Sequence, residues 1–392
     1  MFVATFFVRF AFGITVAVFA SYLARHASGL TGSEVGTAGV VSALAPIGEF
    51  STVLFSGAAA DRWGRFPVLF GGMAGAAVLF VGISTTRSVA ALGVANLAFG
   101  VASGAILAAS LAVVADRAGA DERGYEMGRF DAMNLFGWIG GYAFGLGIEG
   151  VVPNSELGLV FLGGAAAIAA GLGAAAVLVR GVPRAPDRPT FAWGRIVRSA
   201  FRRPVLVVTL PWLVIYSLLG TVLVFLGPAA GGVGIRPGWL AVAIGGVGSV
   251  LVVTQPAFGR LADRLGRTTM MTVGAAGFGL ALLCAALLVR FGLDWPLVGG
   301  VGVGAAMALA YGPAALAALA DLTTEFGRAT TMAIYSLTIS LGMLIGLVAS
   351  SSLFASFGEA GLYPYFGAIA LVLVGLTAVR WTEGRAATTP AR

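Results

Sequence analysis

Charged residues are scarce in this sequence, and lysine is absent altogether. Only 10% of the 392 residues are charged, 58% are hydrophobic and the mean hydropathy is +0.95, whereas a water-soluble domain has roughly 25% charged residues. We therefore expect most of the surface to face lipid. The 24 basic residues are all arginine and form no soluble basic face, which excludes nucleic-acid binding.

Cysteine and histidine are equally rare, since Cys284 and His26 are the only ones. This excludes an internal disulfide and the usual metal sites, so we expect neither a metal nor a cofactor. No grouping of His, Cys and carboxylates indicates an enzyme. The segment 2–25 lacks a basic start and a small-residue cleavage site, so we interpret it as a retained membrane helix and not as a signal peptide.

Runs of about 20 apolar residues, long enough to cross a bilayer, recur along the whole chain. They predict an all-α integral membrane protein with twelve transmembrane helices. The predicted spans are 2–25, 35–60, 67–86, 89–115, 125–148, 157–180, 204–228, 238–261, 268–289, 295–320, 329–356 and 362–381.

The composition divides the chain into an N-terminal six-helix bundle (1–180), a linker (181–203) and a C-terminal six-helix bundle (204–392). The linker is rich in proline and arginine, and it is typical either of a short helix on an anionic bilayer surface or of a solvated basic connection. Arginine is concentrated in the loops that share a side with both termini, so the positive-inside rule predicts cytoplasmic termini in a cell (inner or plasma) membrane.

One nine-residue loop occurs twice. Residues 57–65 (GAAADRWGR) recur as residues 259–267 (GRLADRLGR), and each copy lies between the second and third predicted helices of its half. Asp61 and Asp263 are 202 residues apart, and the later pair Asp116 and Asp321 repeats at a similar offset. The repeat predicts two pseudo-symmetric six-helix bundles.

This loop resembles the signature loop of the major facilitator superfamily, and the likeness extends over essentially the whole chain. It includes the Arg9-Phe10 start, Pro46 in the second helix and the Gly100-x-x-x-Gly104 step in the fourth. The resemblance implies a secondary transporter, active as a monomer, in which two bundles open in turn to either side of the membrane.

The resemblance also implies contacts that hold the cytoplasmic ends together. Asp61 is expected to meet the helix that begins near Ala329, and Asp263 the helix that begins near Tyr125; Arg65 is expected to pair with Asp116, and Arg267 with Asp321. The alternative is that these charges only anchor their loops. The candidate latch residues are Gly57, Asp61, Arg62, Gly64, Arg65, Asp116, Gly259, Asp263, Arg264, Gly266, Arg267 and Asp321.

Ionisable residues inside predicted membrane helices are costly and therefore suggest function. Glu49 lies about 18 Å from the cytoplasmic end at 1.5 Å per residue, near the bilayer midplane, where it could carry a proton, meet a cationic group or hold helices together. Arg9 and Asp131 are expected on neighbouring helices, where they could form a buried ion pair with a structural or a binding role. Asn96, Tyr216, Gln255, Tyr311 and Tyr335 complete the coupling and substrate candidates.

A cavity with charges on one wall and aromatic groups on the other favours a small amphipathic or hydrophobic organic solute over a sugar. Asn96 stands where many proton-coupled exporters of the superfamily carry arginine, and the fifth helix lacks their Gly-Pro step, so import remains an alternative to the preferred export. A proton-coupled solute carrier is the leading hypothesis. A membrane enzyme and a non-transporting sensor are the competing ones.

Overall fold

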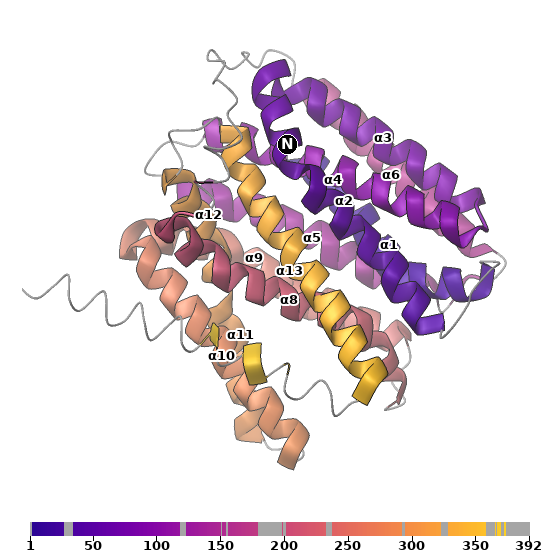
Figure 1. Ribbon diagram of the computed structural model, residues 1–392. Coiled ribbons are helices and arrows are strands. Elements are labelled where there is room, and N and C mark those ends of the chain that lie inside the picture. The colour runs from indigo at the N-terminus through magenta and orange to yellow at the C-terminus, as the bar shows by residue number, and fades with distance from the viewer. Residues whose placement is uncertain are drawn as a thin grey trace, which may run out of the picture.

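The structure is a computed structural model of an all-helical chain, and it describes residues 2–26, 34–117, 123–149, 151–153, 156–178, 198, 201–232, 237–291, 295–322, 328–357, 365, 367–369 and 372–373. The helices of the first half are α1 (Phe2–His26), α2 (Glu34–Trp63), α3 (Arg65–Thr85), α4 (Val89–Arg117), α5 (Arg123–Glu149) and α6 (Leu157–Leu178). Those of the second half are α8 (Arg203–Gly232), α9 (Pro237–Leu265), α10 (Arg267–Phe291), α11 (Trp295–Ala308), α12 (Tyr311–Leu322) and α13 (Arg328–Phe357) (Figure 1).

The predicted spans agree with these helices to within a few residues, which confirms the all-α membrane fold. Eight segments are long and apolar enough to cross a bilayer, judged by length and hydropathy alone. Helix α5, which carries Glu126, Arg129 and Asp131, is not among them. The linker 181–203 and the last predicted helix, 362–381, lie mostly outside the described residues.

The predicted helix 295–320 is not continuous. It is divided into α11 and α12 by a turn at Leu309 and Ala310, where the backbone N–H of Ala310 donates to the carbonyl of Met307. Pro313 explains the break, because a proline has no N–H to donate and its ring clashes with the carbonyl four residues earlier, that of Leu309.

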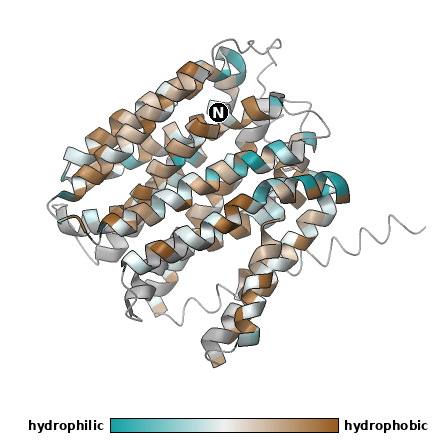
Figure 2. Cartoon of the chain, turned by 180° about the vertical axis from the view of Figure 1, so that it is seen from behind, coloured by the Kyte–Doolittle hydropathy of each residue, from teal (hydrophilic) through white to brown (hydrophobic). Residues whose placement is uncertain are grey.

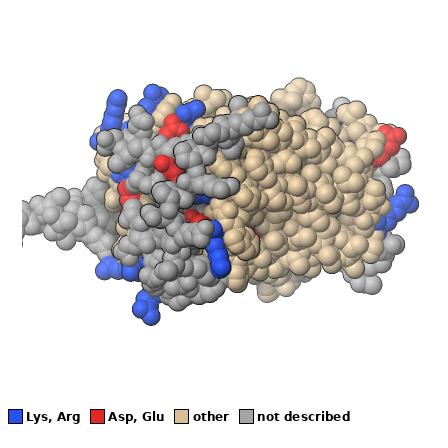
Figure 3. All heavy atoms as spheres, turned by 90° about the horizontal axis from the view of Figure 1, so that it is seen from above, with Lys and Arg blue, Asp and Glu red and all other residues tan. Residues whose placement is uncertain are grey.

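The outer surface is that of a membrane protein. Hydrophobic side chains such as Val78, Val94 and Val253 are exposed on the flanks of the bundle, and hydrophilic residues gather toward helix ends (Figure 2). Figure 3 shows arginines and acidic residues crowded over one end of the molecule, a few at the opposite end, and an uncharged surface between them. We call the crowded end the charged end.

The two halves touch along two seams, one between α5 and α9 and the other between α2 and α13. In the first seam Gly128 lies against Gln255 and Pro256, and a Cβ on Gly128 would stand 2.8 Å from the Gln255 carbonyl oxygen, so glycine permits this approach. Further along, Gly147 lies near Ala241. The helices are thus antiparallel and in contact over much of their length.

Candidate functional site

The repeated loops adopt one conformation. Gly64 and Gly266 have φ angles of 102° and 92°, the left-handed region that favours glycine, and each separates two long helices. Gly57 and Gly259 are buried in α2 and α9, while Arg62 and Arg264 are exposed at the ends of these helices. The loop glycines therefore act as the sequence predicts, by allowing a one-residue reversal.

Each loop arginine forms an ion pair within its own half. Arg65 pairs with Asp116 at the end of α4, and its Nη2 atom is 3.6 Å from Asp61. Arg267 pairs with Asp321 at the end of α12 and also donates to the carbonyl of Ala317 at 3.2 Å. Both expected arginine pairs are present, and they tie neighbouring helices of one half together.

Asp263 forms a contact between the halves. Its carboxylate accepts a hydrogen bond of 3.1 Å from the backbone N–H of Tyr125, in the first turn of α5. This is the expected contact, and it places an acid at a helix N-terminus, where the free N–H groups favour negative charge. The expected partner of Asp61 is the start of α13, whose side chains from 328 to 333 lie outside the described residues.

An aromatic contact accompanies the Asp263 hydrogen bond. The guanidinium of Arg260, on α9, lies 5.3 Å from the centroid of the Tyr125 ring, and that of Arg129 lies 5.7 Å from it. Arg129 also forms an ion pair with Glu126. Of these contacts, the one between Arg260 and Tyr125 crosses the α5–α9 seam at the charged end.

A second group of candidate residues is buried where the halves meet, and we call it the central polar cluster. It consists of Arg9 (α1), Glu49 (α2), Ser103 (α4), Asp131 and Asn134 (α5), Tyr216 (α8), Gln255 (α9), and Tyr335 and Ser340 (α13), each at most 9% exposed. Four helices of the first half and three of the second contribute side chains that the sequence alone does not place together.

Arg9 is held by neutral partners. Its Nε donates to Asn134 Oδ1 at 2.8 Å and its Nη1 to Ser103 Oγ at 3.4 Å. The Glu49 carboxyl interacts electrostatically with Arg9. It also lies close to the hydroxyls of Ser103 and, across the α2–α13 seam, Ser340. Its Oε1 atom has no hydrogen-bond partner within the described part of the chain, so this carboxyl retains capacity for a proton or a ligand.

The ion pair that Arg9 and Asp131 could form on neighbouring helices is not formed. Arg9 bonds Asn134, one helical turn beyond Asp131, and Asp131 instead faces the second half, where its Oδ1 accepts from the Tyr335 hydroxyl at 3.5 Å. The Tyr335 hydroxyl lies 3.4 Å from that of Tyr216. Residues 131 and 134 are about one turn apart along α5 and about 60° apart around it, and Asn134 is the one that meets Arg9 of α1.

The remaining aromatic candidates pack against one side of this cluster. The Trp212 ring lies 4.5 Å from that of Tyr335 and 6.0 Å from that of Tyr311, measured between centroids. Tyr311 donates its hydroxyl to the carbonyl of Val208 at 2.8 Å. Tyr311 is thus part of an aromatic wall, and its polar group is engaged with backbone rather than directed at the carboxyls.

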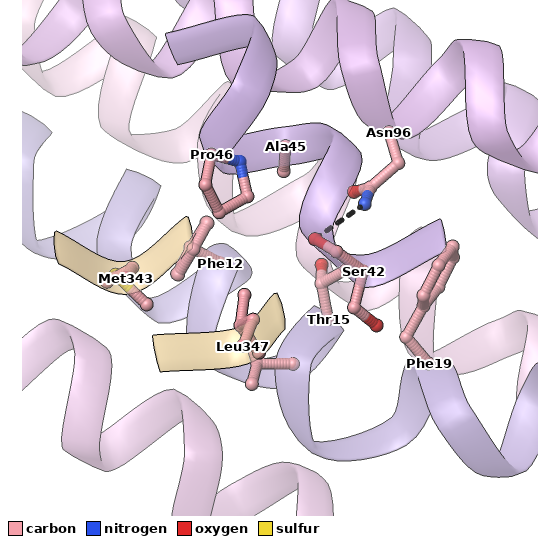
Figure 4. A pocket seen from close by; sticks show the side chains of 10 residues that line it. Phe12, Thr15, Phe19, Ser42, Ala45, Pro46, Asn96, Met343 and Leu347 are labelled. Carbon is pink, nitrogen blue, oxygen red and sulfur yellow. Dashed lines mark hydrogen bonds between the residues drawn. The ribbon is translucent and has the colours of Figure 1, made fainter. Parts of the chain in front are cut away.

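Asn96 lies apart from the cluster. Its Nδ2 donates to the carbonyls of Val41 at 2.7 Å and Ser42 at 3.4 Å, which fixes α4 to α2. It lines a pocket of ≈ 30 Å³ that is otherwise mainly apolar (Figure 4). That is about the space of one water molecule, whereas solute sites measure roughly 300–1,000 Å³, so this pocket is too small for an organic solute. Its lining residues are Phe12, Thr15, Val16, Phe19, Ser42, Ala45, Pro46, Asn96, Met343 and Leu347.

Several cluster residues escape sequence reasoning. Ser103, Asn134 and Ser340 are common polar residues in long apolar helices, and only Asn134 offers a signal, its position one turn after a membrane-embedded aspartate. Gly312 of α12 lies beside the cluster and was also missed by sequence reasoning. A Cβ at this position would stand 2.6 Å from Asp131 Oδ2. Its role follows from the break between α11 and α12, which the sequence analysis did not predict.

The chain is similar to known membrane transporters. A family profile described as Major Facilitator Superfamily matches residues 1–253 and 237–391. The inner membrane transport protein YajR of Escherichia coli is 30% identical over 154 residues, 38% of this chain and 31% of that protein. Multidrug resistance protein 2 of Bacillus subtilis is 34% identical over 125 residues, 31% of this chain and 29% of that protein. The chain thus matches about a third of the length of these relatives.

Two solved structures share the fold. The human organic anion transporter MFSD10 (TETRAN) superimposes with a TM-score of 0.74 at 18% identity, over 96% of this chain and 97% of that one. The proton:xylose symporter XylE, bound to 6-bromo-6-deoxy-D-glucose, superimposes with a TM-score of 0.76 at 15% identity, over 97% and 93%. These two structures show the fold, and the family profile over nearly the whole sequence shows that the chain belongs to the major facilitator superfamily, a family of multi-pass membrane transporters.

Proposed function

We propose that this protein moves a small amphipathic organic solute across the inner or plasma membrane by alternating access, and that protons drive the movement. The proposal includes a monomer of two six-helix bundles, 1–180 and 204–392, joined by the linker 181–203, with both termini in the cytoplasm. The charged end is then cytoplasmic, in keeping with the positive-inside rule.

The observation that carries the proposal is the environment of Glu49. This carboxyl is 5% exposed, lies on α2 at the seam with α13, and has an oxygen with no hydrogen-bond partner in the described part of the chain. Its neighbour Arg9 is already bonded to Asn134 and Ser103. A buried acid with a free oxygen at a moving interface can exchange a proton or a solute group as the seam opens.

The packing of the two seams supports an alternating mechanism. In this conformation the halves touch along α5–α9 and α2–α13, and the pocket at Asn96 is about the size of one water molecule. An organic solute can reach the cluster only if one end of both seams separates. The contacts of Asp263 and Arg260 with Tyr125 must then break whenever the charged end opens.

The wall of Trp212, Tyr216, Tyr311 and Tyr335 supports an organic, partly apolar solute. These rings offer large apolar faces beside three ionisable groups, Arg9, Glu49 and Asp131. Export is favoured by the name of the Bacillus relative, a multidrug resistance protein, and proton-driven import remains the second candidate because XylE, which shares the fold, is described as a proton symporter.

The test is transport by purified protein in liposomes under an imposed pH gradient, with a panel of amphipathic dyes of positive, neutral and negative charge. Glu49→Gln is expected to retain dye binding and to lose gradient-driven accumulation. Glu156→Gln, which changes an exposed carboxyl, is the matched control and should behave as the parent. Unchanged gradient dependence in Glu49→Gln removes Glu49 from the coupling role, and the direction of dye movement decides between export and import.

A further inference from the structure

Asp131 and Gln255 lie near one another across the α5–α9 seam, and Gln255 carries an unpartnered oxygen. Gln255 is 2% exposed, and its Oε1 atom has no hydrogen-bond partner within the described residues. The same point in space, where a Cβ on Gly312 would stand, is 2.6 Å from Asp131 Oδ2 and 3.9 Å from Gln255 Oε1. Two acceptor oxygens from opposite halves therefore border the same residue without a side chain.

Two buried acceptors in such an arrangement require a hydrogen between them. An ionised Asp131 would present negative charge to the amide oxygen in a medium of low dielectric. Within the described part of the chain no ion pair joins Asp131 to a cation, and Arg9 bonds Asn134 and Ser103. A protonated Asp131 has an O–H that can donate to Gln255 Oε1 after a small rotation of either side chain. Protonation thus turns a repulsive contact into a bond.

The hydrogen bond from Tyr335 can be accepted by either form of the Asp131 carboxyl. The Tyr335 hydroxyl donates to Asp131 Oδ1, so its oxygen is left to accept from Tyr216. With a proton on Oδ2, the hydrogen bonds run in one direction from Tyr216 through Tyr335 and Asp131 to Gln255. Three of these four residues belong to the second half, so the chain of bonds joins the halves only through Asp131.

We propose that Asp131 binds a proton as the two halves close, and that its carboxyl then donates to Gln255 Oε1 over Gly312. This inference rests on the proposed alternating access and adds a second proton site to it, distinct from Glu49. Glu49 serves solute coupling, whereas the Asp131 proton stabilises the closed α5–α9 seam. Gly312 acts as a positioning residue, because the break between α11 and α12 brings its bare backbone beside the carboxyl.

Few other ionisable groups face Asp131. Tyr335 of α13 bonds Asp131, and Arg9 of α1 and Asp131 both interact electrostatically with Tyr216 of α8 and with Tyr335. The facing residues of α9 and α12, Gln255 and Gly312, carry no charge. Glu49 acts on Tyr216 from the far side of the cluster. A pH response of closure that vanishes with Asp131 is therefore attributable to this residue.

The test measures closure at equilibrium, without solute and without transport. Spin labels are placed at Trp63→Cys and Leu265→Cys in a Cys284→Ala background, since these two residues are exposed at the ends of α2 and α9 and belong to different halves. The ratio of short to long label distances in lipid nanodiscs then reports closure of the charged end. A protein that failed to transport would still give this ratio, so the inference and the proposed function can fail separately.

Acidification should raise the closed fraction of the parent, by about tenfold in the ratio if the proton affinity of Asp131 differs tenfold between the two states. Asp131→Asn should remain closed at all pH values, because its amide can donate to Gln255 permanently. Glu49→Gln should retain the response. Gly312→Ala, whose Cβ would crowd Asp131 Oδ2, and Gln255→Leu should both lose closure at low pH.

Two results overturn the inference. If Asp131→Asn and the parent respond equally to pH, the proton resides elsewhere. If alkalinisation closes the parent, the Gln255 amide N–H₂ faces an ionised carboxylate and the bond has the opposite polarity. If Asp131→Asn fails to fold, Gly312→Ala still tests the inference, because it disturbs the same contact while the Asp131 carboxyl is intact.

Discussion

Replacement of Asp263 should loosen the charged end of the α5–α9 seam by a calculable amount. Its carboxylate accepts the Tyr125 N–H at 3.1 Å, and a hydrogen bond to a charged group contributes about 1.5–3 kcal/mol. Asp263→Ala removes this contribution from the closed state only. Since each 1.4 kcal/mol is about a factor of ten, the closed-to-open ratio should fall roughly 10- to 100-fold.

Asp263→Asn refines the expectation. Its amide oxygen can still accept from Tyr125, but a neutral hydrogen bond contributes only about 0.5–1.5 kcal/mol, and the favourable interaction of a charge with the helix N-terminus, about 0.3–1 kcal/mol, is lost. The asparagine variant should therefore lie between the parent and Asp263→Ala. This order separates the effect of charge from that of the hydrogen bond.

The assay is the distance distribution between labels at Trp63 and Leu265, at fixed pH. Asp321→Asn is the matched control: it removes an acid of the same end, but one that pairs with Arg267 inside the second half. It should lower thermal stability and leave the closed-to-open ratio close to that of the parent. The reasoning is refuted if Asp263→Ala leaves the ratio unchanged, or if Asp321→Asn shifts it as strongly.

Two further predictions concern contacts between neighbouring helices. Gly141→Ala should destabilise the fold by about 1–3 kcal/mol, because its Cβ would overlap the backbone of Phe10; Gly140→Ala, whose Cβ would meet only the Phe10 ring at 3.8 Å, is the control, and equal melting temperatures for the two variants would contradict the argument. Arg260→Ala should reduce closure by a factor of about two to thirty, since a cation–π contact contributes about 0.5–2 kcal/mol; label distances check this, and Arg260→Lys should restore part of the loss.

The two seams are copies of one repeat, yet their chemistry differs. Helix α2 corresponds to α9 and α5 to α13, but at the offset of 202 residues that relates α2 to α9, Arg260 corresponds to Ala58. The cation–π contact therefore has no counterpart at the other seam. We expect the α2–α13 end to be the weaker of the two.

The central polar cluster is asymmetric in the same way. At that offset Glu49 corresponds to Leu251 and Gln255 to Val53. Helix packing is thus repeated in the two halves, while each ionisable side chain occurs once. The proton sites that we propose are specific to single positions and do not follow from the repeat.

The sequence by itself determined the helices and the charged end. A bilayer requires about 20 apolar residues per crossing, so the spans can be read directly from hydropathy. The resemblance of the repeated loop to the superfamily's signature loop implied the Arg65–Asp116, Arg267–Asp321 and Asp263–Tyr125 contacts, all of which are present. These features depend on local composition or on a motif that carries its own geometry.

Only the tertiary structure decided which buried polar groups meet. The rotation of α5 about its axis places Asn134 beside Arg9 and Asp131 beside Tyr335. The turn before Pro313 places Gly312 beside Asp131. In a helix that is apolar nearly all round, hydropathy does not specify the rotation, because no polar face marks the side that meets its neighbours. Close packing against the other helices sets that angle, and with it the chemistry of the site.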